Sequence, residues 1–168
     1  MELWRALNPP LLRYLTVRGN HSPEDIAAET WLQVIRDLTS FCGDSTDFRA
    51  WLFTVGRNRA IDQGRARRAR PAVPVPEVED GRTAPSAEWV ALERDSTASA
   101  LRLVATLPPD QAEMVMLRVV VGLDVAVVAE IVGKVPGTVR VAVHRALRTL
   151  SHDPRVQQIR AQSAREVV

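Results

Sequence analysis

Residues 134–150 read KVPGTVRVAVHRALRTL and predict a helix with one apolar and one basic face. Pro136 suits the first turn of a helix, because the N–H that proline lacks has no intrahelical partner there. Apolar residues at i, i+4, i+7, i+8 and i+11 are expected to face a core, and they are Val139, Val143, Ala146, Leu147 and Leu150. The side left exposed then carries Arg140, Val141, His144, Arg145 and Arg148.

The residues before this helix complete the pattern of a helix-turn-helix. Asp124 is expected to cap a short helix that runs to Val132, and Gly133 and Lys134 form the turn. Two short helices joined by a glycine-bearing turn, the second more basic, are typical of this DNA-binding motif. A helix of about 15 residues is roughly 22 Å long and suits the major groove. Basic surface helices often contact only water, but the cap and turn before this one favour duplex DNA as its partner.

Helical patterns fill the rest of the chain, and no alternating run of strand length stands out, so the sequence predicts an all-α protein. In the first half we expect helices over 2–18, 23–38 and 48–69, with a loop over 39–47. In the second half we expect helices over 89–107, 109–121 and 124–132 before the basic one.

The first three helices each show an apolar stripe. Pro9 and Pro10 predict that the first is kinked or broken, and Ser22 is a good N-cap for the second. The expected apolar face of the first contains Leu3, Leu7, Leu11, Leu12 and Leu15. The expected stripe of the second contains Ile26, Ala27, Thr30, Trp31, Val34, Ile35 and Leu38. The expected inner residues of the third are Phe48, Trp51, Leu52, Val55 and Ile61.

Charge is distributed unevenly around a net value of +2. Residues 1–70 hold 11 basic and 8 acidic side chains, 71–100 hold 2 and 6, and 101–168 hold 9 and 6. The stretch 71–88, PAVPVPEVEDGRTAPSAE, reads as an extended linker because prolines interrupt any periodicity. We therefore expect two domains, 1–70 and 98–168, joined by a proline-rich acidic linker over 71–97, with each basic domain touching a polyanion.

Several classes of function find no support in the sequence. The single cysteine, Cys42, cannot form an internal disulfide, and we expect it to be a buried or half-buried packing residue. No Cys/His cluster has metal-ligand spacing. Paired carboxylates, a phosphate-binding glycine loop and a nucleophile–base arrangement are missing too, so we expect neither a catalytic site nor a metal or cofactor. With no long apolar run and no signal-like start, the chain is expected to insert into no membrane and to act in the cytoplasm.

Both halves resemble one protein family. LPPDQAEMVMLRVVVGLDVAVVAEIVGKVPGTVRVAVHRALRTL resembles region 4 of bacterial extracytoplasmic-function (ECF) sigma factors, the small two-domain initiation factors of RNA polymerase. SPEDIAAETWLQVIRDLTSF resembles their region 2.2, and DFRAWLFTVGRNRAIDQGRARRAR resembles their regions 2.3 and 2.4. The match runs in the family's order over nearly the whole chain, so we expect a promoter-specificity subunit without catalysis of its own.

The resemblance also implies roles for individual residues. Residues implied for the −35 element are Arg140, Val141, His144, Arg145 and Arg148. Those implied for the −10 element are Phe41, Asp44, Ser45, Arg57, Asn58, Asp62 and Arg65, in a loop that takes a flipped base and the helix after it. Those implied for docking on the clamp of the largest polymerase subunit are Asp25, Glu29, Gln33 and Arg36. Further implied partners are the polymerase flap, promoter DNA and an anti-sigma factor.

The chain departs from the family pattern in the recognition helix. Val135 stands where a capping serine or threonine is usual, and Val141 and Ala142 replace a short polar residue and an arginine. The −35 contact is therefore expected to be more apolar, with Val141 against a thymine methyl. Phe48 and Trp51 could stack on an opened strand, but their spacing with Leu52 favours a core role.

Two other classes of function remain for comparison. A stand-alone helix-turn-helix regulator would bind duplex DNA without polymerase, at half-sites about one turn apart. A nucleic-acid enzyme is the weakest candidate, since His21, His144 and His152 are scattered and form no site.

Overall fold

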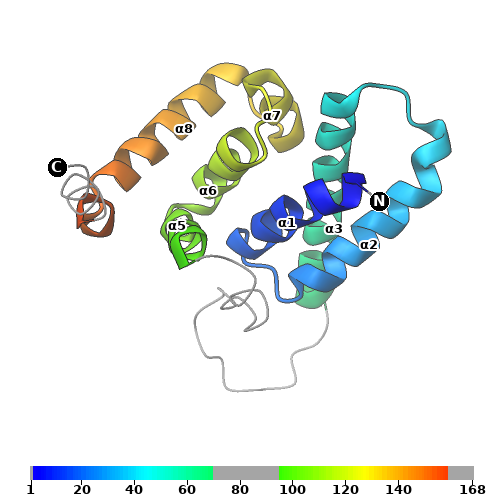
Figure 1. Ribbon diagram of the computed structural model, residues 1–168, viewed down its shortest axis with the longest axis horizontal. Coiled ribbons are helices and arrows are strands. Elements are labelled where there is room, and N and C mark those ends of the chain that lie inside the picture. Colours follow the sequence, from blue (N-terminus) through cyan, green and yellow to red (C-terminus); the bar gives the residue numbers. More distant parts are fainter. Residues whose placement is uncertain (1, 70–94, 159–168) are drawn as a thin grey trace. The chain divides into compact units, whose positions relative to one another are not determined.

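The computed structural model describes residues 2–69 and 95–158, and these residues form helices, turns and loops without a β-strand (Figure 1). The all-α prediction is confirmed. Contacts divide the chain into two units, Met1–Leu101 and Arg102–Val168. Most of the predicted linker, 71–97, lies outside the described residues, although the helix that follows it already begins at Asp95. The domain boundaries stay predictions.

The first unit contains α1 (Glu2–Val17), α2 (Pro23–Asp37), a short 3₁₀ turn (Leu38–Ser40) and α3 (Ser45–Ala69). All three α-helices pack against one another, as Figure 1 shows. Their shared core contains Leu11, Tyr14, Leu15, Ile26, Leu52 and Phe53, each 1% exposed or less. Burial of one such side chain stabilises the fold by about 1.5–3 kcal/mol.

The prediction of a broken first helix is wrong, because α1 runs from Glu2 to Val17 with Pro9 and Pro10 inside it. Each proline removes a hydrogen bond to the carbonyl four residues earlier, on Arg5 or Ala6. Both of those residues are exposed, so water can satisfy their carbonyls. Packing of Leu7 and Leu11 in the core holds the helix together on either side of the prolines.

Three further predictions for the first unit are wrong. Leu3 is 53% exposed, Ile35 is 64% exposed and Leu38 is 48% exposed. The buried face of α2 consists of Ile26, Ala27, Thr30 and Val34, and Ile35 lies about 100° around the helix from Val34. Leu38 lies past the end of α2, so the helical period no longer applies to it.

Ser22 stands at the N-cap of α2, but its side chain makes no cap hydrogen bond. The helix is started by other features, namely Pro23 in its first turn and a hydrogen bond from the Ile26 N–H to the Ser22 carbonyl (3.1 Å). Glu24 and Asp25 add negative charge near the positive end of the helix dipole.

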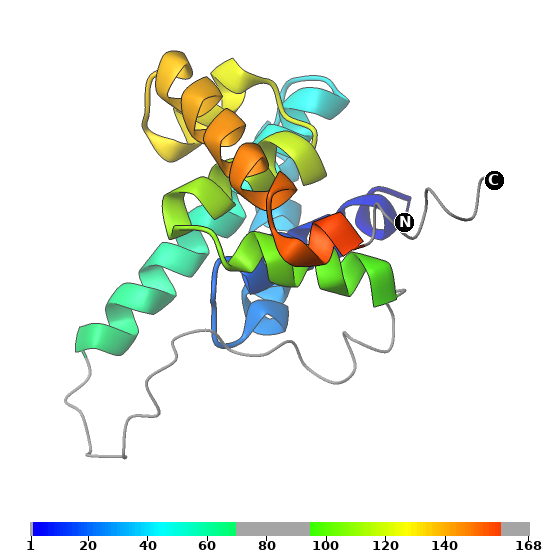
Figure 2. The same ribbon diagram turned by 90° about the vertical axis from the view of Figure 1, so that its left-hand side faces the viewer.

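The second unit contains the end of α5 (Asp95–Ala105), then α6 (Pro109–Val115), a π turn (Met116–Val120), α7 (Val125–Val132) and α8 (Pro136–Ser151). The predicted helix 109–121 is thus α6 plus the π turn, in which the Val121 N–H bonds the Met116 carbonyl (2.9 Å). Both α6 and α7 pack on α8, and Figure 2 shows the turn that joins α7 to α8. The core contains Leu107, Met116, Leu117, Leu123, Val128, Val139 and Ala146.

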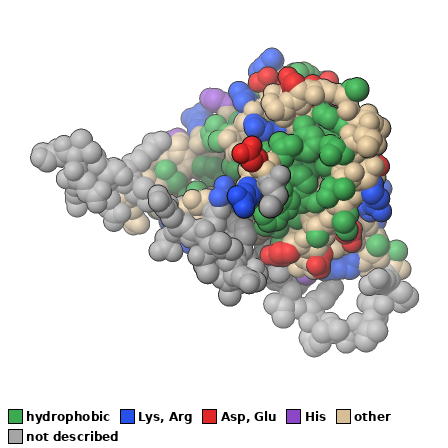
Figure 3. All heavy atoms as spheres, turned by 45° about the vertical axis from the view of Figure 1, so that its right-hand side comes forward, with side chains coloured by type: hydrophobic (Ala, Val, Ile, Leu, Met, Phe, Trp, Pro, Cys, Tyr) green, Lys and Arg blue, Asp and Glu red, His purple; other side chains and the backbone are tan. Residues whose placement is uncertain are grey.

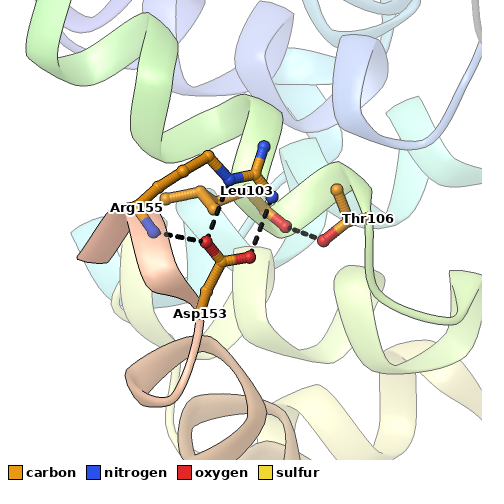
Figure 4. A network of polar contacts seen from close by, with 4 residues as sticks. All are labelled: Leu103, Thr106, Asp153 and Arg155. Carbon is orange, nitrogen blue, oxygen red and sulfur yellow. Dashed lines mark hydrogen bonds and ion pairs between the residues drawn. The ribbon is translucent and has the colours of Figure 1, made fainter. Parts of the chain in front are cut away.

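Beyond α8 the chain is tied by Asp153, whose carboxylate accepts from Arg155 (Figure 4). The Arg155 backbone N–H, Nε and Nη2 donate to it at 2.9, 2.9 and 2.8 Å. These bonds, chiefly the one from the Arg155 side chain, lower the pKa of Asp153 to about 2. In the same view the Thr106 hydroxyl donates to the Leu103 carbonyl (2.7 Å) and closes the end of α5.

Candidate nucleic-acid interface

The face of α8 that was predicted to be basic is exposed. All five predicted −35 residues, Arg140, Val141, His144, Arg145 and Arg148, are exposed, while Val139 and Ala146 on the opposite side are fully buried. Leu147 was predicted to face the core and is 43% exposed, so that prediction is wrong. Val139 and Ala146 define the buried line, and Leu147 falls one residue beyond it, on the rim of the basic face.

The turn before α8 sets the direction of this face. Gly133 has a left-handed backbone (φ 68°), the Lys134 N–H bonds the Ala129 carbonyl (2.9 Å) and the Gly133 N–H bonds the Glu130 carbonyl (3.3 Å). This pair of bonds is a Schellman ending, which satisfies the last carbonyls of α7. The expected cap at Asp124 supplies only its carbonyl, because its side chain makes no cap hydrogen bond.

The N-terminal end of α8 is open to solvent. Val135 is the N-cap residue, is 66% exposed and makes no side-chain cap bond. Next to it, Gly137, Thr138, Val141, Ala142 and Arg145 line a shallow hollow with Gln111 of α6. Backbone N–H groups at such a helix start attract phosphate, and an apolar Val141 beside Arg145 suits a thymine methyl next to a guanine or a phosphate. The sequence did not single out Gln111 or Thr138, since the hollow forms only when α6 packs on α8.

On the first unit, the loop predicted to take a base from the −10 element is held by reciprocal hydrogen bonds. Asp44 Oδ1 accepts from the backbone N–H groups of Thr46 (2.7 Å) and Asp47 (3.0 Å), and Asp47 Oδ2 accepts from the Asp44 N–H (3.0 Å). The bonds from Asp47 and then Thr46 hold the pKa of Asp44 below its usual range. Asp44 therefore caps α3 as an ionised carboxylate, and Ser45 is exposed at the first helical position.

Gly43 makes this loop possible. A Cβ at Gly43 would lie 2.7 Å from the Asp47 Cβ and 2.8 Å from Asp47 Oδ2, and its φ of 154° is one that other residues rarely adopt.

Aromatic side chains pack together next to this loop. The Phe41 ring stacks on Trp51 (centroids 5.0 Å apart, 16° between planes) and meets Phe48 edge-on (5.5 Å). Phe48 is 6% exposed, as its predicted core role requires, whereas Phe41 and Trp51 are half-buried.

The predicted strand-reading residues of α3 lie on one stripe. Asn58, Asp62 and Arg65 follow at i, i+4 and i+7 and are exposed, and Arg57 is half-buried beside them. Arg65 Nη1 lies 3.9 Å from Asp62 Oδ1, with side chains 77% and 70% exposed. An ion pair this exposed contributes little to stability, so Arg65 can exchange Asp62 for a phosphate at small cost.

The predicted polymerase-docking residues of α2 differ among themselves. Asp25, Glu29 and Arg36 are exposed, but Gln33 is half-buried in a network. Gln33 Oε1 accepts from Arg59 Nη2 of α3 (2.7 Å) and from Arg36 Nη2 (2.9 Å), and its amide donates to Asp37. Gln33 thus ties α2 to α3.

Apolar side chains lie beside these polar residues. Leu32 (59%) and Ile35 (64%) of α2 and Trp4 (52%) of α1 are exposed. In the view of Figure 3, exposed hydrophobic side chains form a patch with charged side chains around it. Such exposure is common at protein-binding surfaces, and the sequence had placed Ile35 in the core.

Within residues 2–69 and 95–158, no group of three His, Cys, Asp or Glu side chains could hold a metal ion. Over the same residues no helix combines the length and apolar character needed to cross a membrane. Cys42 is exposed, contrary to the packing role we expected.

Comparisons with known proteins match both units. The model of Sigma-70 region 2 matches residues 3–70, and that of Sigma-70 region 4 matches residues 97–150. The ECF RNA polymerase sigma factor SigD of Mycobacterium tuberculosis is 34% identical over 161 residues, covering 90% of this chain and 75% of SigD. The ECF RNA polymerase sigma factor BldN of Streptomyces coelicolor is 37% identical over 139 residues, covering 82% of this chain but only 53% of BldN.

Two solved structures share the fold. The sigma factor RpoE of Bartonella quintana, in complex with the anti-sigma factor NepR, matches with a TM-score of 0.63 at 23% identity, covering 89% of this chain and 92% of that one. CnrH, in complex with the cytosolic domain of CnrY, matches with a TM-score of 0.59 at 19% identity, covering 89% and 83%. With matches to both sigma-70 regions and relatives above 30% identity, this chain belongs to the ECF family of RNA polymerase sigma factors.

Proposed function

We propose that this chain is the promoter-specificity subunit of RNA polymerase, which binds the core enzyme, recognises the −35 and −10 elements and assists promoter opening. The observation that carries the proposal is the exposed basic face of α8, in a chain whose relatives are named ECF RNA polymerase sigma factors. In this role the chain performs no catalysis itself, and it acts where the polymerase acts, in the cytoplasm.

Contacts to the −35 element are assigned to α8. Arg140, Arg145 and Arg148 provide guanidinium groups, of which Arg145 borders the hollow at the start of the helix. An arginine that bonds a guanine in two places discriminates against other bases by about 1–3 kcal/mol. Val141, 49% exposed, supplies the apolar contact.

Contacts to the −10 element are assigned to the loop Phe41–Ser45 and to α3. Base flipping costs a few kcal/mol and needs a pocket that is already formed, and the capped loop on its aromatic base supplies one surface of it. Asn58 can present a donor and an acceptor to one base edge. Arg57 and Arg65 bind phosphate, with Asp62 as the exchangeable partner of Arg65.

Protein partners are assigned to other faces. Asp25, Glu29 and Arg36 of α2 face solvent and dock on the clamp of the largest subunit, with Gln33 holding the helix in place, and the second unit binds the flap. An anti-sigma factor completes the set, because RpoE and CnrH, which share this fold, were solved in complex with NepR and with CnrY.

Reconstitution with core polymerase tests the proposal. We expect the chain to bind core enzyme tightly, to bind free promoter DNA weakly, and to direct specific transcripts whose start sites sequencing can map. A stand-alone regulator would instead bind duplex DNA specifically without polymerase. Core enzyme that starts no specific transcript with this chain present, on any template of a genomic library, would refute the proposed role.

A further inference from the structure

A cavity of about 440 Å³ opens on the first unit between the α1–α2 turn and the C-terminal turns of α3, which lie side by side at the bottom of Figure 1. Its lining includes Arg18 and His21 from the turn and Arg65, Arg67 and Arg68 from α3. None of the described residues that line it is acidic. Its size falls within the range of about 300–1,000 Å³ that is usual for ligand sites, and its charge selects for anions.

The cavity is not the face assigned to the −10 element. That face follows Asn58, Asp62 and Arg65, whereas Ile61, Gly64 and Arg68 follow the neighbouring stripe at i, i+3 and i+7. Arg65 lies at the border of the two. The cavity therefore offers basic groups that the proposed strand contact leaves unused.

One wall of the cavity is held in place before any ligand binds. Gly19 has a left-handed backbone (φ 80°), and its N–H bonds the Thr16 carbonyl (2.9 Å). The Asn20 side chain donates to the Leu15 carbonyl (3.0 Å). Arg18 Nη1 donates to the hydroxyl of Tyr14 (3.3 Å), whose ring is buried against Phe53. A guanidinium anchored in this way loses less entropy when it binds an anion.

The lining of the cavity contains a glycine, Gly64, that packing does not require. Gly64 lies inside α3, where glycine is less stable than alanine. A Cβ added there would meet nothing within 4 Å, so no neighbour excludes a side chain. Because Gly64 is among the residues that line the cavity, a long charged side chain there can reach the arginines of the lining.

We propose that this cavity binds a run of linked phosphate groups. Guanidinium groups bind phosphate through paired, charge-assisted hydrogen bonds, and arginines on two walls fit several phosphates better than one. The phosphates are those of a free oligophosphate, because the backbone of promoter DNA is already assigned to Arg57 and Arg65 of α3. The inference goes beyond the proposed function, since a free oligophosphate takes no part in promoter recognition.

Calorimetric titration of the full chain with inorganic tripolyphosphate at low salt tests the inference. Gly64→Glu places a carboxylate in the cavity, and Ala66→Glu, the matched control, makes the same change of charge at an exposed position outside the lining. We expect wild type to bind at one site. Gly64→Glu should weaken binding about tenfold or more, the effect of losing one charge-assisted hydrogen bond, and Ala66→Glu should leave it within about twofold because the cavity stays open.

Promoter binding by the holoenzyme tests whether the same groups serve only the DNA backbone. The inference is overturned if tripolyphosphate fails to bind while Gly64→Glu lowers promoter affinity and reduces the salt slope of binding by about one phosphate contact relative to Ala66→Glu. Arg68→Gln keeps the helix and adds no negative charge. It should also weaken tripolyphosphate binding, and it provides the test if Gly64→Glu does not fold. Equal binding of tripolyphosphate by Gly64→Glu and Ala66→Glu also overturns the inference, and transcription by the wild type still tests the proposed function separately.

Discussion

Replacing Gly133 with alanine measures how much the left-handed backbone of the turn contributes to the stability of the helix-turn-helix. Gly133 has φ 68°, and a Cβ added there would meet nothing within 4 Å. The substitution therefore introduces no collision, and its whole cost comes from forcing a residue with a Cβ into the left-handed region. That cost is about 1–2 kcal/mol. Asparagine tolerates the left-handed region better, so Gly133→Asn should lose less.

A matched control lies four residues along the chain. Gly137 also has open space around its Cβ position, but it is within α8 and has no positive φ. Alanine is preferred to glycine in a helix by about 0.5–1 kcal/mol, so Gly137→Ala should stabilise the same unit. The same substitution is thus expected to have opposite signs at two neighbouring positions.

Amide hydrogen exchange of peptides from α7 and α8 measures the difference. A loss of one to two kcal/mol should raise exchange about 5- to 30-fold in Gly133→Ala, with a smaller rise in Gly133→Asn and slower exchange in Gly137→Ala. Peptides from α1 to α3, which belong to the other unit, serve as an internal reference. If Gly133→Ala exchanges no faster than wild type, the left-handed turn is not what orients α8, and the reasoning fails.

Two further predictions concern the interface with DNA, and a third concerns the pH dependence of stability. Arg145→Ala should weaken −35-dependent transcription by about 5- to 150-fold, the range for one arginine–guanine contact; an unchanged run-off transcript would remove Arg145 from the site. Asn58→Ala should change −10 preference or slow promoter opening, measured by permanganate footprinting, while binding to core polymerase stays at the wild-type level. Hydrogen bonds from Arg155 lower the pKa of Asp153 from its ordinary 3.8 to about 2, so its contribution to stability is present above about pH 4 and declines as pH falls toward 2. Urea unfolding between pH 5 and 2 should therefore show a weaker acid dependence for Asp153→Asn than for wild type, and equal slopes would contradict the assignment.

Helical periodicity was sufficient to predict both the helix and its buried residues where the helix has a single buried stripe. The predicted helices correspond to α2, α3, α7 and α8, and Val139 and Ala146 are fully buried as the spacing required. At the edges of these stripes it predicted burial for residues that are exposed. Ile35 and Leu147 are apolar residues one position past a buried neighbour, and whether such a residue is covered depends on a partner helix that the local sequence does not specify.

Proline and capping rules were less decisive than the packing around them. Pro9 and Pro10 were expected to interrupt a helix that packing keeps whole, because the carbonyls that lose their donors face solvent. Asp124 and Ser22 are good capping types at the right place, yet neither side chain makes the bond. Asp44 does cap α3, reciprocally with Asp47, and the sequence had given it only a role toward DNA.

The orientation of side chains at the candidate site depends on contacts between residues far apart in the sequence, which local patterns do not reveal. Asn58 faces solvent, while its neighbour Arg59 turns inward and bonds Gln33, which is 26 positions earlier in the chain. Since Arg36 donates to the same oxygen, one amide on α2 receives two guanidinium groups. This polar contact adds to the burial of Leu52 and Phe53, which fixes the rotation of α3 about its axis. The core face of α3 thus directs Asn58 outward, and Gln33, on the helix assigned to polymerase docking, supports that orientation. A surface residue and its orienting partner carry no shared local pattern, so this link between the two faces becomes visible only in the folded unit.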